Sequence, residues 1–239
     1  MRLVVIGVVA GFFSALFGVG GGLVIVPLLL LVAHWDERPA MATSLAAIGM
    51  TALTGTILYA LHGKVDPSYA ALVGLPAAVG AVAGAALQQH IRRRGLSLLF
   101  SALLVGVAIE LLFSPPRLSE SFALAVVLGF AAGILAGMFG VGGGILFVPT
   151  LLALGLSQLH AEATSLLAIL PTAAAGTWRQ SRYGNVRWRP AGVLGLSSIA
   201  GAEGGILVAT NLPEDVLRRL FAVLMLCVAA QLAWRARRA

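Results

Sequence analysis

The sequence predicts an all-α polytopic membrane protein built from two inverted repeats. The prediction rests on composition, on a glycine-rich phrase that occurs twice inside apolar segments, and on the distribution of positive charge. Hydrophobic residues make up 59% of the 239 residues, charged residues make up 10%, and the mean hydropathy is +0.99. Because a soluble domain carries about 25% charged residues, we expect the chain to lie in a lipid bilayer.

The repeat is visible in the letters of the chain. Residues 17–22 read FGVGGG and precede Pro27, and residues 139–144 read FGVGGG and precede Pro149, at an offset of 122 positions. A second shared phrase, ATSL, starts at Ala42 and again at Ala163. These matches predict an N-terminal repeat, 1–114, and a C-terminal repeat, 115–239, within one integral membrane domain.

The first apolar run, Leu3 to Ala33, is too long for one crossing. As one helix it would be about 46 Å long, whereas the hydrocarbon core is about 30 Å thick. Adjacent glycines also each cost about 1 kcal/mol in a helix interior. We therefore expect a break at 18–22, and in the second copy a break between arms 123–139 and 145–156. The remaining spans are expected at 40–61, 68–87, 96–113, 161–175, 190–210 and 216–234.

Positive charge indicates how the broken runs sit. If each run dips into the membrane and returns as a hairpin, 12 of the 16 Lys and Arg share one side, against 10 if each run crosses. The positive-inside rule favours the hairpins and places both termini in the cytoplasm of an inner-membrane protein. Each half then has five arms or spans, so the second half is inverted and the glycine tips approach the midplane from opposite sides.

The glycine tips are the candidate anion site. Glycine permits tight turns and close approach of a ligand to the backbone, and the short arm that begins at each tip presents unpaired N–H groups and a positive dipole end. The alternative is that the glycines only permit close helix packing. The candidate binding residues at the tips are Gly20, Gly21, Gly22, Gly142, Gly143 and Gly144.

Two hydroxyl residues begin the span that follows each hairpin: Thr43 and Ser44 in the first half, and Thr164 and Ser165 in the second. Their O–H groups can donate to an oxoanion, or they can cap helices or bond to nearby carbonyls. The pairs Gly80/Gly84 and Gly201/Gly205 are expected to be packing positions instead.

Glu203 is the candidate for proton coupling, because buried intramembrane acids are functional candidates. The alternative is a carboxyl that only pairs with a hydroxyl or an arginine. Histidine spacing predicts no metal site, and the sequence predicts no cofactor and no catalytic motif. The net charge of +7 comes from short runs between apolar segments, which predicts contact with anionic lipid rather than nucleic acid.

The phrases FGVGGGLVIVP and FGVGGGILFVP, each followed by ATSL, resemble the sulfite exporter TauE/SafE family of membrane transporters. The resemblance covers nearly the whole chain. It implies transport of sulfur-containing anions such as sulfite or organosulfonates, with proton or other ion coupling, and not enzyme activity. The single cysteine disfavours thiosulfate carriers.

The sequence therefore predicts a secondary transporter that binds a small oxoanion between the two hairpin tips near the bilayer midplane. Two alternatives stay open: a membrane-embedded enzyme acting on a lipid or phosphate group, and a passive anion channel. A homodimer is compatible with the sequence.

Overall fold

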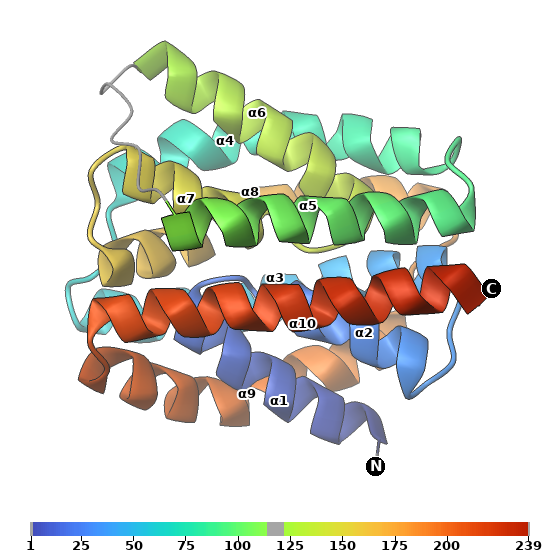
Figure 1. The fold of residues 1–239 in the computed structure, drawn as a ribbon, viewed down its shortest axis with the longest axis horizontal. Helices are drawn as coiled ribbons and strands as arrows, with labels where there is room; N and C mark the ends of the chain where they lie inside the picture. Colours follow the sequence, from blue (N-terminus) through green and yellow to red (C-terminus); the bar gives the residue numbers. More distant parts are fainter. Residues whose placement is uncertain (1, 114–121, 239) are drawn as a thin grey trace.

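The computed structural model describes residues 2–113 and 122–238, and these fold entirely around α-helices (Figure 1). The helices are α1 (Arg2–Phe17), α2 (Gly22–Leu31), α3 (Glu37–Leu61), α4 (Pro67–Gln88), α5 (Arg93–Phe113), α6 (Phe122–Phe139), α7 (Gly144–Ala153), α8 (Gln158–Arg182), α9 (Trp188–Asn211) and α10 (Glu214–Arg238). The predicted all-α class is confirmed, and each predicted span overlaps a helix.

Both long apolar runs break at the glycines, as the sequence predicts. Helix α1 ends at Phe17 and α2 begins at Gly22, while α6 ends at Phe139 and α7 begins at Gly144. Six glycines between these helices adopt left-handed backbone conformations that disfavour side chains with a Cβ. Their φ angles are 67° at Gly18, 73° at Gly20, 86° at Gly21, 71° at Gly140, 80° at Gly142 and 97° at Gly143. Glycine is therefore required by the turn itself.

Six helices of the described chain are long and apolar enough to cross a membrane: α3, α4, α5, α6, α9 and α10. Helices α1, α2 and α7 are shorter. Helix α8 has 25 residues but is not among the six, and it carries Glu162 and two arginines. The chain is therefore a multi-pass membrane protein.

The helices of the two halves pack reciprocally. Helix α1 packs on α9 and its repeat counterpart α6 packs on α4, while α3 packs on α8 and α5 packs on α10. Small residues make these contacts close: a Cβ on Gly80 would overlap the backbone of Phe130, and one on Gly201 would overlap that of Val8. Gly84 and Gly205 make equivalent backbone contacts, so the expected packing role of these four glycines is confirmed.

Figure 1 shows how the two broken segments enter the bundle. Both termini and the α2–α3 and α4–α5 connections lie toward the right of the view, whereas the α7–α8 and α9–α10 connections lie at the left. We call these the terminal side and the opposite side. Helices α1 and α2 therefore form a hairpin that opens toward the terminal side, and α6 and α7 form one that opens toward the opposite side.

Candidate functional site

The two glycine loops, 18–21 and 140–143, bring their ends against each other. A Cβ on Gly22 would lie 2.6 Å from Cα of Val141, and a Cβ on Gly144 would lie 2.5 Å from Cα of Val19. Real Cβ atoms do not approach backbone so closely, so glycine at both positions permits direct contact between the loops. The structure thus joins segments that are about half the chain apart.

Two isoleucines cover this contact. A Cβ on Gly20 would lie 2.7 Å from Ile48 and 3.1 Å from Ile169, and one on Gly142 would lie 2.8 Å and 3.2 Å from the same two side chains. Ile48 lies near the middle of α3 and Ile169 near the middle of α8, and both are fully buried. The glycine loops therefore meet midway along the two central helices.

In each short helix, the backbone hydrogen bonds start at the N–H group of the third residue. In α2 the N–H groups of Val24 and Ile25 donate to the carbonyl of Gly21, at 3.0 and 2.9 Å. In α7 the corresponding bonds run from Leu146 and Phe147 to Gly143, both at 2.9 Å. The first two N–H groups of each helix precede these bonds, so the positive ends of α2 and α7 lie at the loop contact.

The predicted threonines make equivalent cross-repeat hydrogen bonds. Thr43 Oγ1 accepts the backbone N–H of Arg187, the residue before α9, at 3.1 Å. Thr164 Oγ1 accepts the backbone N–H of Asp66, the residue before α4, at 3.0 Å. Each hydroxyl thereby satisfies an N–H beside a helix start in the other half, and among the described contacts its own hydrogen is not used as a donor.

The predicted serines differ between the two halves. Ser165 Oγ donates to the carbonyl of Gly18 and lies 2.9 Å from the carbonyl oxygen of Glu162. Ser44 Oγ is buried and has no hydrogen-bond partner in the described part of the chain. The hydroxyl of Ser44 is therefore a donor without an acceptor, and buried polar groups ordinarily have one.

Glu203 lies away from the glycine loops. Its side chain is exposed on α9, on the side of that helix opposite to the buried Gly201 and Gly205. The helix therefore turns residue 203 away from the rest of the protein, and the coupling role expected of Glu203 stays a prediction.

Sequence reasoning missed Glu162, which is 0% exposed in the first turns of α8. Its Oε1 accepts a 2.7 Å hydrogen bond from Nε2 of Gln158, and its Oε2 has no partner among the described residues. A signal was present: Glu162 precedes the second ATSL phrase, at the position that Met41 occupies before the first.

A buried amide network was also missed. Gln88 donates from Nε2 to the carbonyl of Met138 near the end of α6, and its Oε1 accepts from Nε2 of Gln180 at 2.7 Å. Gln180 Oε1 in turn accepts from Nδ2 of Asn185 at 2.9 Å. The network ties the end of the second broken helix to α4 and α8.

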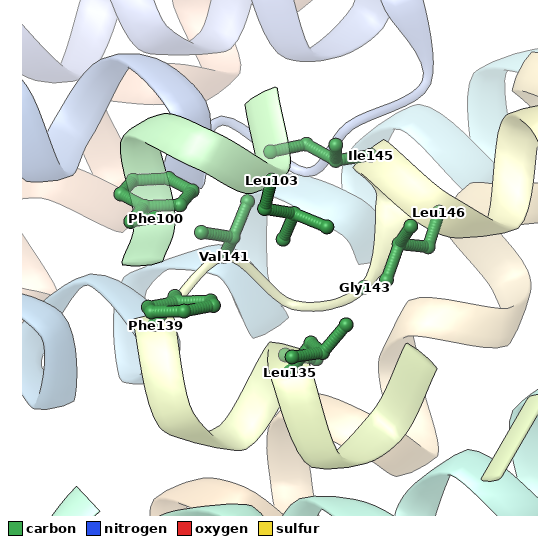
Figure 2. A pocket seen from close by; sticks show the side chains of 9 residues that line it. Phe100, Leu103, Leu135, Phe139, Val141, Gly143, Ile145 and Leu146 are labelled. Carbon is green, nitrogen blue, oxygen red and sulfur yellow. The ribbon is translucent and has the colours of Figure 1, made fainter. Parts of the chain in front are cut away.

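A small cavity beside the second glycine loop is apolar. It measures ≈ 10 Å³ and is lined by Phe100, Leu103, Leu135, Phe139, Val141 and Ile145, among others (Figure 2). This volume holds about one water molecule, and the lining side chains carry no polar atom. The side of this loop that faces the cavity is therefore lined by hydrocarbon.

Two broken helices that meet inside a multi-pass bundle are characteristic of membrane transporters. The family model described as sulfite exporter TauE/SafE matches residues 3–127 and again residues 124–239. The chain belongs to this family, whose members are transporters and not enzymes.

Curated relatives agree with this assignment. A probable membrane transporter protein of Xylella fastidiosa (strain Temecula1) is 30% identical, with 96% of this chain and 93% of the relative covered. The probable membrane transporter protein YdhB of Bacillus subtilis is 29% identical over 91% of this chain and 94% of its own length. YunE of the same organism is 25% identical over 97% and 96%. No solved structure matches.

Proposed function

We propose that the protein is a secondary transporter of small sulfur-containing oxoanions, such as sulfite or organosulfonates. The observation that carries the proposal is the meeting of the two glycine loops, with the N-terminal ends of α2 and α7 at the contact. Two such ends supply N–H donors and positive potential for one anion. The family description supports the sulfur oxoanion as substrate.

The binding residues are the glycines at positions 20–22 and 142–144, assisted by the hydroxyls of Ser44 and of the two threonines. Ser44 has an unused donor, and Thr43 and Thr164 accept through oxygen only in the described contacts. Because the backbones of Gly22 and Val141 touch, an anion enters between the loops only when they separate. Ile48 and Ile169 then control access from the middle of the bundle.

Alternating access follows from the opposite directions of the two hairpins. We assign the halves as inverted repeats, with the terminal side in the cytoplasm and the protein in the inner membrane. Support comes from the side of each hairpin opening and from the excess of Lys and Arg on the terminal side. A homodimer and a proton as coupling ion belong to the same proposal.

A ligand panel tests the substrate. Purified protein is heated with sulfite, an organosulfonate, sulfate, thiosulfate or chloride, and the melting temperature is measured. A ligand at 100 times its Kd stabilises by about 2.7 kcal/mol, so sulfite or the sulfonate should raise the melting temperature and chloride should not. Absence of any shift, together with absence of uptake into proteoliposomes, would contradict the proposal.

Counterflow separates a carrier from a passive anion channel. Proteoliposomes loaded with unlabelled sulfite should accumulate labelled sulfite transiently above the outside concentration, because a carrier exchanges one anion for another. A channel dissipates the gradient without such an overshoot.

A further inference from the structure

We propose that Glu162 is the proton-binding group that couples a proton gradient to movement of the first glycine loop. This inference rests on the proposed transport function and assigns its coupling residue. Three observations lead to it: the burial of Glu162, the lack of a hydrogen-bond partner for its Oε2 among the described residues, and the methionine at the equivalent position of the other repeat.

The carboxyl of Glu162 is buried in the protein, and none of its described hydrogen-bond partners is a cation. Glu162 is 0% exposed, Oε1 has only the amide of Gln158 as donor, and Oε2 has no partner among the described residues. An ionised carboxylate is costly to bury without a positive charge beside it. The neutral acid has no such cost, and its O–H can donate a hydrogen bond, so the packed arrangement favours the protonated form.

Among the described residues, the titratable groups near this turn of α8 supply no positive partner for Glu162. Tyr59 of α3 donates its hydroxyl to the carbonyl of Ala15, and Asp66 at the start of α4 accepts from the N–H groups of Ser68 and Tyr69. Glu214 at the start of α10 accepts from the N–H of Gln158 at 3.4 Å, and His160 of α8 pairs with Ser157. Tyr59 and Glu214, the titratable groups that act on Glu162 among the described residues, are therefore a phenol and an acid, and neither supplies a positive charge.

The other repeat shows that the fold does not need an acid here. The backbone of Glu162 packs against Gly18, and a Cβ on Gly18 would lie 2.5 Å from Cα of Glu162. The equivalent contact in the other half is between Gly140 and Met41, where a Cβ would lie 2.6 Å from Cα of Met41. Methionine satisfies the same packing, so the carboxyl of Glu162 serves something other than packing.

The contact with Gly18 links the carboxyl to the site. Gly18 starts the first glycine loop, and the same turn of α8 holds its carbonyl through the hydroxyl of Ser165. That loop continues to Val19, whose Cα faces Gly144 of the second loop. An ionised Glu162 carboxylate is more stable in contact with water than buried, so ionisation would move this turn of α8 toward water. That movement would loosen the packing against Gly18 and, with it, the contact between the two glycine loops.

Proton access is provided from the opposite side. Glu214 is exposed and its Oε2 contacts the backbone N–H of Gln158, whose side chain holds Glu162. A proton from water on that side forms the Oε2–H bond of Glu162 and neutralises the carboxylate. When the bundle opens the other way, the same O–H bond breaks and the proton passes to water on the terminal side.

Proteoliposome transport with sulfite as the probe tests the assignment. Sulfite exchange at equal concentrations needs no coupling ion, whereas accumulation driven by an imposed pH difference does. Glu162→Gln and Glu162→Met should keep exchange within about twofold of wild type and lose pH-driven accumulation. Glu110→Gln, which removes an exposed acid from α5, should behave like wild type in both assays.

Infrared spectroscopy supplies a readout that does not depend on transport. The wild-type protein should show the carbonyl stretch of a protonated, buried carboxylic acid, and Glu162→Gln should lack it. Absence of that band in wild type, or full pH-driven accumulation by Glu162→Gln, would overturn the inference. Sodium-driven accumulation that is lost in Glu162→Gln without any pH response would also overturn it in favour of a cation site. Wild type that exchanges no sulfite contradicts the proposed function alone, because the infrared band still reports on Glu162.

Discussion

Tyr59 and Gln180 occupy equivalent positions in the two repeats, and each helps to hold the end of a broken helix. The hydroxyl of Tyr59 donates to the carbonyl of Ala15 near the end of α1 at 2.8 Å. Gln180 binds Gln88, which donates to the carbonyl of Met138 near the end of α6. The last carbonyls of a helix lack intrahelical partners, so a broken helix inside a bundle needs such donors, and the two halves supply them with different side chains.

Removing the hydroxyl of Tyr59 should destabilise the first hairpin. Tyr59→Phe leaves the buried carbonyl of Ala15 without this donor, which costs about 1–3 kcal/mol, and thermal unfolding in detergent should begin at lower temperature. Tyr183→Phe is the matched control, because Tyr183 is exposed near the end of α8. Equal melting temperatures for the two variants would show that the bond to Ala15 does not support the hairpin.

An added methyl group at the loop contact should impair both stability and sulfite binding. Gly22→Ala places a Cβ against Val141, and Gly144→Ala places one against Val19, and the backbone cannot move aside freely. Overpacking of this kind costs about 1–3 kcal/mol. Neither glycine has a positive φ, so the effect isolates the contact from backbone strain.

Gly106→Ala is the control for these two variants. Gly106 lies in α5 with open space around it, so alanine there should be neutral or stabilise by about 0.5–1 kcal/mol. Melting curves and sulfite titrations compare the three proteins. If the loop variants bind sulfite as wild type does, the anion site lies away from the loop contact.

Truncating the central isoleucines should loosen the cover of the glycine loops. Ile48→Ala and Ile169→Ala each remove a fully buried side chain, at a cost of about 2–5 kcal/mol, and sulfite leak through proteoliposomes should rise. Leu53→Ala, which truncates an exposed side chain of α3, serves as the control. Unchanged leak in both isoleucine variants would remove these side chains from the access route.

Cysteine labelling should report the proposed topology. Cys227 is exposed and is first replaced by serine. Cysteines at His90 and Arg189 should react with a membrane-impermeant reagent from one face, and cysteines at His62 and Glu214 from the other. Labelling of positions 90 and 189 from different faces would contradict the inverted repeats.

The sequence by itself determined the membrane class, the duplication and the breaks at the glycines. These follow from local physics: glycine runs are poor helix formers, and a long apolar run exceeds the bilayer thickness. The left-handed conformations at Gly21 and Gly143 lie where the repeated phrase predicts a turn.

Only the tertiary structure decided which faces of the helices turn inward. Both Glu203 and Glu162 lie in helices of similar length, yet packing of α9 leaves the first exposed and packing of α8 buries the second. The same holds for Thr43 and Thr164, whose partners Arg187 and Asp66 belong to the opposite repeat. Contacts between distant segments depend on how the whole bundle assembles, and hydrophobic periodicity is weak where helices are apolar on all sides.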